Sequence, residues 1–157
     1  MITSGNSTLR AAQYNLYHNN GSWKQDTKAQ YKEMTAMFTP DGMTAVGEHA
    51  YFDDETNLVF KRFGTTMTMA EYLTMAMQTA KSLGKAYYVG EWGGTKVQQD
   101  YSAVANTLVD CGVQLALLWN YNLEEGTVEG SFSANTSQGQ QLLNIVKNMN
   151  ERYASKY

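Results

Sequence analysis

The sequence of 157 residues predicts one α/β domain built on a parallel sheet. Short apolar runs rich in β-branched and aromatic residues alternate with segments whose apolar residues recur at helical spacing. The strand runs are nearly continuous in apolar residues, as in parallel strands that helices cover. No proline-rich or low-complexity linker divides the chain. We therefore expect four strand–helix units in the order βαβαβαβα.

The first two units occupy the N-terminal part of the chain. The first strand is a short one, MITSG, at residues 1–5. After LRAAQYNLY, a helix is expected from about Gln25 to Phe38, and Pro40 ends it. Its apolar residues share one face: Tyr31, Met34, Met37 and Phe38. The second strand is MTAVGEHAYF, at residues 43–52, and a loop containing DDET follows it.

The third unit opens with a helix start signal. Thr68 and Glu71 have the spacing of a capping box, in which each side chain binds the backbone amide of the other residue. The helix that follows is expected to stop at Gly84. The third strand is GKAYYVGEWGG, at residues 84–94.

The last two helices flank the fourth strand. The first of them ends at Gly112, and Cys111 within it is interpreted as a small buried apolar residue. The fourth strand is VQLALLWNYN, at residues 113–122. The final helix is recognised by an apolar stripe of Leu142, Leu143, Ile145, Val146 and Met149.

Composition limits the classes of function. The net charge of -3 and the scattered 12 Lys and Arg residues give no basic patch, so nucleic acid is not an expected partner. No apolar run approaches ~18 residues, so no membrane segment is expected. The N-terminal stretch lacks the features of a signal peptide, which leaves localisation unknown. One cysteine allows no internal disulfide, and neither a metal nor a cofactor is expected. Eleven Tyr and three Trp suit a flat polar ligand such as a sugar, although a Tyr-rich core would explain them equally.

A carboxylate stands at the end of the third strand. Glu91 follows the apolar run Tyr87 to Val89 and lies between Gly90 and Trp92. Strand ends are where α/β folds carry their chemistry, so Glu91 is a candidate catalytic residue. The alternative is a structural carboxylate that holds a loop. An open Rossmann-like sheet is the alternative fold, but no G-x-G-x-x-G follows the first strand, and GEWGG has the wrong spacing to bind phosphate.

Three strand ends together carry a family resemblance. YVGEWGG, preceded by HAY one strand earlier and followed by LALLWNYN one strand later, resembles the last three strands of a family 5 glycoside hydrolase. This is a cellulase-like family of retaining enzymes on a TIM barrel, and ITSGNS is similar to its fifth strand. Four units are too few to close an eight-stranded barrel. The resemblance therefore implies the C-terminal half of such a barrel, strands five to eight, as a single half-barrel domain over residues 1–157.

The resemblance assigns roles to three residues around the carboxylate. Glu91 matches the catalytic nucleophile, which forms a covalent glycosyl intermediate. His49 and Tyr51, two apart on one strand and therefore on one face, match the His-x-Tyr pair that hydrogen-bonds the nucleophile. Taken alone, His49 would more often be a core histidine with satisfied hydrogen bonds.

The resemblance also implies residues that contact substrate. Trp119 matches the tryptophan of the eighth strand, on which a sugar ring stacks, while the alternative is a side chain that fills the barrel. Trp92, Asn120 and Asn122 are expected near the mouth of the barrel as further contacts. The implied substrate is a β-glycan, and the implied reaction is hydrolysis of O-glycosyl bonds in polysaccharide degradation.

One half of the catalytic apparatus is missing from this pattern. The family carries its general acid/base in an Asn-Glu pair on the fourth strand, and the chain has no such strand. One carboxylate cannot both attack the sugar and protonate the leaving group, so the isolated chain is expected to be inactive or weakly active. Two bare strand edges would favour association, either as a homodimer that closes an eight-stranded barrel or with a complementary N-terminal half-barrel. The alternatives are a non-catalytic sugar-binding module and a self-assembling half-barrel. Members of the family are commonly secreted.

Overall fold

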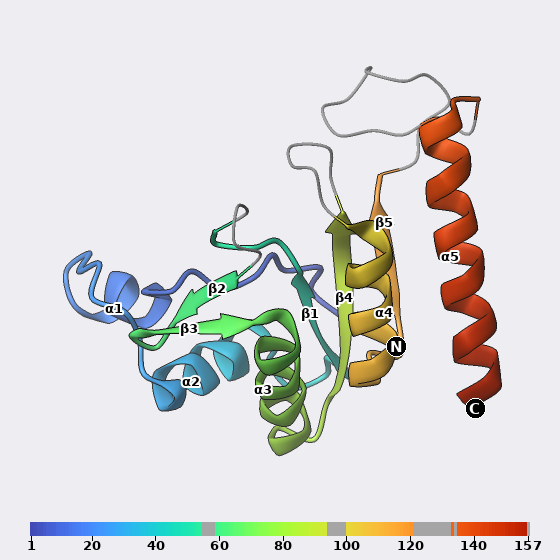
Figure 1. Ribbon diagram of the computed structural model, residues 1–157. Helices are drawn as coiled ribbons and strands as arrows, with labels where there is room; N and C mark the ends of the chain where they lie inside the picture. Colours follow the sequence, from blue (N-terminus) through green and yellow to red (C-terminus); the bar gives the residue numbers. More distant parts are fainter. Residues whose placement is uncertain (55–58, 94–99, 121–132, 134, 157) are drawn as a thin grey trace.

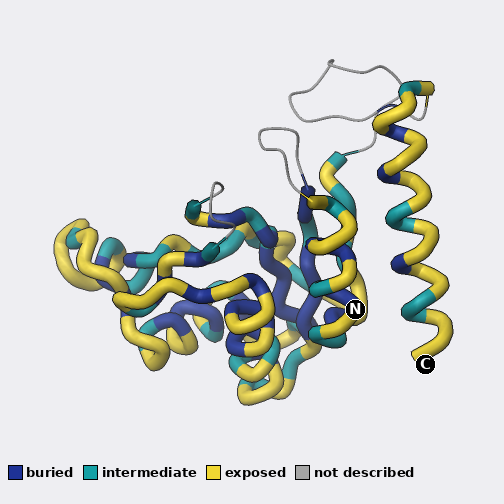
Figure 2. The backbone as a smooth tube through the Cα atoms, in the orientation of Figure 1, coloured by how far each residue is buried: buried dark blue, intermediate teal, exposed yellow. Residues whose placement is uncertain are grey.

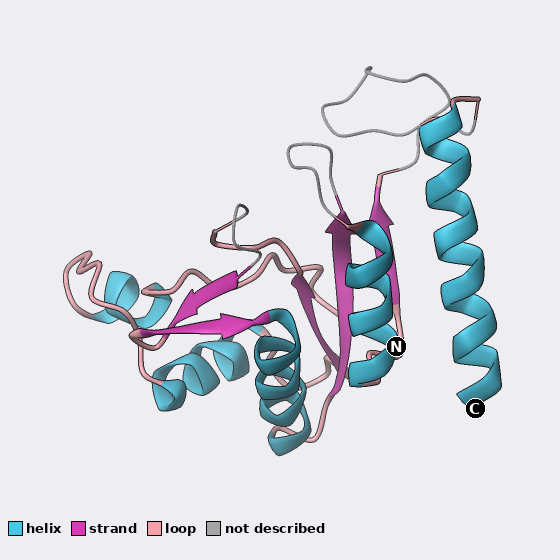
Figure 3. Cartoon of the chain, in the orientation of Figure 1, coloured by secondary structure: helices cyan, strands magenta, loops and turns pink. Residues whose placement is uncertain are grey.

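The computed structural model describes residues 1–54, 59–93, 100–120, 133 and 135–156. Its main sheet has three parallel strands in the order β1-β4-β5, which are β1 (Ala45–His49), β4 (Ala86–Gly93) and β5 (Ala116–Trp119). A separate antiparallel pair consists of β2 (Val59–Arg62) and β3 (Thr65–Thr68). Five helices are found in the described part of the chain (Figures 1 and 3): α1 (Gln13–His18), α2 (Lys28–Phe38), α3 (Met69–Ser82), α4 (Tyr101–Cys111) and α5 (Ser137–Lys156). The expected α/β class with a parallel sheet is confirmed.

The first of the four expected strands does not form. Residues 1–5 have no strand structure, and the segment contacts β1 only through Ile2, whose carbonyl oxygen accepts hydrogen bonds from the amides of Thr44 (2.9 Å) and Ala45 (3.2 Å). At Gly5 the backbone turns to φ 65° and leaves the extended conformation. Within the described residues the parallel sheet therefore has three strands, and the N-terminal segment meets the start of β1 through Ile2.

The β2–β3 hairpin occupies a region that the sequence analysis assigns to a loop. Its turn consists of Phe63 and Gly64, both at positive φ (58° and 73°), which is the backbone twist that joins two strands most closely. The Phe63 ring makes an edge contact with the Tyr31 ring at 5.8 Å between centroids. The hairpin packs on α3 through Phe60, whose ring stacks on that of Tyr72 at 4.1 Å.

Capping residues define the helix ends close to where the sequence predicts them. Thr68 and Glu71 form the expected capping box at the start of α3, and Thr27 forms a second one with Gln30 at the start of α2. Helix α2 ends at Phe38, two residues before Pro40. Helix α4 ends at Gly112, which is in the left-handed conformation at φ 81°.

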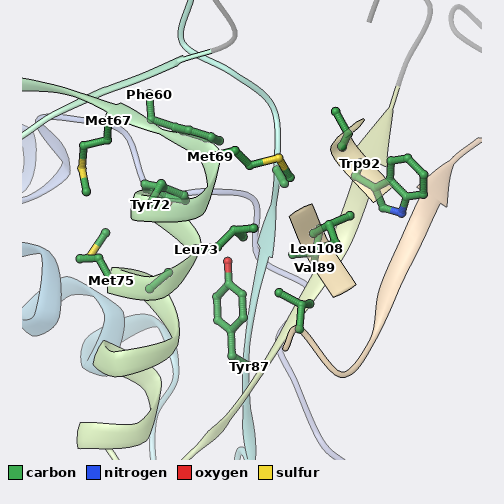
Figure 4. Close-up of a cluster of buried hydrophobic side chains, with 14 of the residues drawn as sticks. Phe60, Met67, Met69, Tyr72, Leu73, Met75, Tyr87, Val89, Trp92 and Leu108 are labelled. Atoms are coloured by element: carbon green, nitrogen blue, oxygen red, sulfur yellow. The ribbon is translucent and has the colours of Figure 1, made fainter. Parts of the chain in front are cut away.

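The core lies between the sheet and the helices α3 and α4, with the hairpin packed against α3 (Figure 4). Its fully buried large side chains are Trp92, Tyr72, Phe60, Met34, Leu73, Leu108, Val89, Val109 and Val113. Helix α5 packs on α4 and is buried along one side only (Figure 2).

Two sequence predictions about burial are corrected. Leu143 of the expected apolar stripe is 39% exposed, and Cys111 is half-buried, with its thiol directed at the Ala70 carbonyl oxygen of α3.

Candidate functional site

The pairing of β1 with β4 places His49 directly beside Glu91. Glu48 pairs with Val89, but the next residue of β1, His49, pairs with Glu91. One extra residue, Gly90, is therefore inserted in β4, which makes a β-bulge. Successive side chains of a strand point to opposite faces, so the bulge moves Glu91 onto the face that carries His49. We call this side of the sheet, opposite the helices, the open face.

Glycine at position 90 leaves room for this arrangement. A Cβ atom there would lie 3.3 Å from the Tyr88 ring and 3.5 Å from Cδ2 of His49. The imidazole thus lies close over the bulge. Its backbone is held as well, because Thr8 Oγ1 donates a hydrogen bond to the His49 carbonyl oxygen.

Two side chains converge on one oxygen of Glu91. The Tyr51 hydroxyl donates to Oε2 at 3.0 Å, and Nδ1 of His49 lies 3.1 Å from the same atom. The His49 and Glu91 side chains are 21% and 22% exposed, so the carboxylate is sheltered but open to a ligand. Burial, and then the hydrogen bond to Glu91 and its charge, raise the pKa of Tyr51. Tyr51 therefore keeps its proton and acts as a permanent donor to the carboxylate.

The structure separates the residues expected to contact substrate. Trp119 pairs with Gly93 across β4 and β5 and is 38% exposed, at the same end of the sheet as Glu91. Trp92 is fully buried, because the bulge turns it toward the helices; it is a core residue, and its expected place as a surface contact is corrected. Asn120 is half-buried, and its Oδ1 has no hydrogen-bond partner among the described residues. Asn122 lies outside the described residues.

We call Glu91, His49 and Tyr51 together the Glu91 cluster. A pocket of about 430 Å³ adjoins it. His49 and Tyr51 line one side of it, and Trp23, Asp53 and Arg62 line others. None of the last three residues is recognised from the sequence, because they come from the loop after α1 and from the hairpin region, which no motif links. A larger pocket of about 850 Å³ lies between α2, β3 and α3 and includes none of the expected site residues.

A second carboxylate lies on the opposite face of the sheet and was also missed. Glu48 is fully enclosed and accepts hydrogen bonds from the hydroxyls of Tyr31 (2.6 Å), Tyr72 (3.0 Å) and Tyr87 (3.1 Å). Burial raises the pKa of Glu48, and the three hydrogen bonds oppose that shift. The sequence signal was a charged residue inside an apolar strand. Glu48 anchors α2 and α3 to the sheet and does not reach the open face.

Comparisons with known proteins add no further evidence. No protein-family model matches the sequence, and a search of curated proteins finds no match. Within the described residues, no group of three or more His, Cys, Asp or Glu side chains is arranged to hold a metal ion. None of the helices that the structure describes is long and apolar enough to cross a membrane.

Proposed function

We propose that the Glu91 cluster is a β-glycan site of the family 5 glycoside hydrolase type, with Glu91 as the nucleophile. The observation that carries this proposal is the convergence of Tyr51 and His49 on a single oxygen of a strand-end carboxylate. The Tyr51 hydrogen bond and the imidazole beside the same oxygen fix the orientation of the carboxylate. Its second oxygen then serves as the attacking atom.

The chemistry follows from this geometry. A Glu91 oxygen forms a bond to the anomeric carbon while the bond from that carbon to the leaving oxygen breaks, which gives a covalent glycosyl ester. The leaving oxygen needs a proton from an acid, and water later hydrolyses the ester with the conjugate base of that acid. Trp119, exposed at the same end of the sheet, supplies a flat surface for the sugar ring.

The acid is expected from outside the described residues. Glu48 faces the helices, and Asp53, the carboxylate of the neighbouring pocket, is ion-paired with Arg62. We propose that the chain is a half-barrel completed by a second copy or by a complementary half. The edge strand β5 supports this, because its Leu117 is 48% exposed beside a strand edge that pairs with no other strand among the described residues.

A non-catalytic glycan-binding protein is the second candidate. It is favoured by the engagement of the two other carboxylates described at this part of the sheet, since Glu48 is bound by three tyrosine hydroxyls and Asp53 is ion-paired with Arg62. Binding needs only the exposed Trp119 and the polar cluster, whereas turnover needs both carboxylic acids.

The nucleophile can be tested without the missing acid. A fluorinated β-cellobioside with a dinitrophenolate leaving group needs no proton donor, since dinitrophenolate departs unprotonated. We expect the folded chain to form a glycosyl ester that mass spectrometry of peptides places on Glu91. The Glu91→Gln variant should not be labelled, whereas Glu33→Gln, which changes an exposed carboxylate on α2, should be labelled as the unaltered chain is.

The same samples separate the two candidates. Labelling at Glu91 supports the hydrolase-type site even if soluble β-glucan and β-mannan are not turned over. Binding of these glycans without labelling favours the glycan-binding protein. A folded chain that neither binds nor becomes labelled contradicts both candidates.

A further inference from the structure

We infer that the pocket beside the Glu91 cluster is a second hexose-binding subsite, with Trp23 as its stacking surface. This inference rests on the proposed function and extends it along the glycan. The pocket of about 430 Å³ is within the usual size of small-ligand sites, roughly 300 to 1,000 Å³.

Trp23 is a large aromatic residue that is exposed to solvent and held by an arginine. The residue is 70% exposed, and the guanidinium carbon of Arg10 lies 5.9 Å from the centroid of its ring. Arginine over an indole face is a favourable cation–π arrangement. The contact steadies the ring at the edge of the pocket, which Arg10 also lines.

A buried network holds the loop that carries Trp23. The Asp26 carboxylate accepts hydrogen bonds from the backbone amides of Tyr14 (2.7 Å) and Asn15 (3.1 Å) and from the Asn15 side chain (2.9 Å). Asp26 and Asn15 are only 4% and 5% exposed. Asn15 Nδ2 also donates to the carbonyl oxygen of Lys24, the residue after Trp23. The loop is therefore pre-organised, and an indole held in place loses little entropy when it binds a ligand.

The pocket is continuous with the candidate site. His49 and Tyr51 line it and also bind Glu91, so they form the boundary between the two. A glycan with one hexose at Glu91 would place a neighbouring hexose beyond this boundary, against Trp23.

The lining favours a neutral sugar. Arg62 is ion-paired with Asp53, so these two charges compensate each other. Ser7 and Thr8 also line the pocket and add hydroxyl groups to its polar lining. A hexose ring has an apolar C–H face for the indole and equatorial hydroxyls for such polar groups, so the lining matches a β-linked hexose.

The test is calorimetric titration of the full chain with the monosaccharides glucose and mannose and with the hexasaccharides of the cello- and manno-series. We expect Trp23→Ala to weaken hexasaccharide binding about tenfold, the value of a lost stacking contact, and to leave monosaccharide binding unaffected. Tyr17→Ala is the matched control, because Tyr17 is a 61% exposed aromatic of α1 that does not line the pocket. Trp119→Ala should weaken both ligands, and circular dichroism confirms that each variant is folded.

The outcomes separate this inference from the proposal on which it rests. If the unaltered chain binds and Trp119→Ala weakens binding while Trp23→Ala does not, the subsite is refuted and the glycan site stands. If the unaltered chain binds no oligosaccharide, the subsite is refuted, and the labelling of Glu91 decides whether the proposed function stands. Retention of hexasaccharide affinity in a Trp23→Phe variant, with loss in Trp23→Ala, would identify the aromatic ring as the binding element.

Discussion

Two carboxylates on neighbouring strands show how position sets chemistry at the scale of single residues. Glu91 lies beside Tyr51 and His49 on the open face, about one-fifth exposed, whereas Glu48 is enclosed among three tyrosine hydroxyls on the helix face. Partial exposure suits a group that must meet a ligand. Full burial makes Glu48 a structural group whose charge is costly.

The burial of Glu48 predicts a pH-dependent stability. The pKa of Glu48 is raised in the folded chain, so the protonated carboxyl group stabilises the folded state. This contribution is complete at pH values below 4.5, the ordinary pKa, and is lost as the pH rises through the raised pKa. We expect the free energy of unfolding to decrease over that interval. A Glu48→Gln variant, which keeps the shape and an acceptor, should show a smaller decrease. Urea unfolding of both chains across the interval measures this, and equal pH dependence would contradict the assignment.

At the scale of elements, local chemistry at the ends decides where helices begin. The capping box of α3 was predicted because its two partners are within three residues of each other, whereas that of α2, Thr27 with Gln30, has the same spacing and was not recognised. The β2–β3 hairpin was not readable, since its turn is Phe63-Gly64 and not a common Asn-Gly pair. The Phe63 contact with Tyr31, distant in sequence, supports the positive φ that Phe rarely adopts.

The cap of α3 provides a test at this scale. Thr68→Ala removes the side-chain acceptor for the Glu71 amide and should lower the free energy of unfolding by about 1 kcal/mol. Thr74→Ala, the same change at an exposed position inside α3, should cost less or be neutral. Urea denaturation measures both, and an equal loss in the two variants would show that the capping box contributes nothing.

At the scale of the whole molecule, β5 is an edge strand of the parallel sheet among the residues that the structure describes. Leu117 and Trp119 of this edge strand are 48% and 38% exposed. An exposed apolar edge is a site for pairing with another strand, which is the basis of the half-barrel proposal.

We expect the chain to be a homodimer in solution, and Leu117→Lys to make it monomeric, since a charge on an edge strand opposes pairing. Leu143→Lys changes a side chain of similar exposure on α5 and should leave the dimer intact. Size-exclusion chromatography with light scattering gives the mass of each. A monomeric unaltered chain, or a Leu117→Lys dimer, would exclude pairing through β5.

The proximity of His49, Tyr51 and Glu91 was anticipated from motifs at strand ends, because parallel strands bring their carboxyl ends to one edge. The burial of Trp92 was not anticipated. Side chains alternate between the two faces along a regular strand, and in β4 without the bulge this alternation would place Trp92 on the open face. The sites around Trp23 and Glu48 were missed for another reason. Their partners come from segments far apart in the chain.

By itself the sequence determined the α/β class and the helix ends, because each depends on neighbours in the chain or on a repeated strand–helix order. The resemblance carried by the strand-end motifs implied the cluster of Glu91, His49 and Tyr51. Tertiary structure alone decided the bulge at Gly90, the loss of the first strand, the hairpin and the pocket at Trp23. These features depend on register, packing and contacts between distant segments. Local propensity and periodicity contain no information about which of those contacts has the lowest free energy.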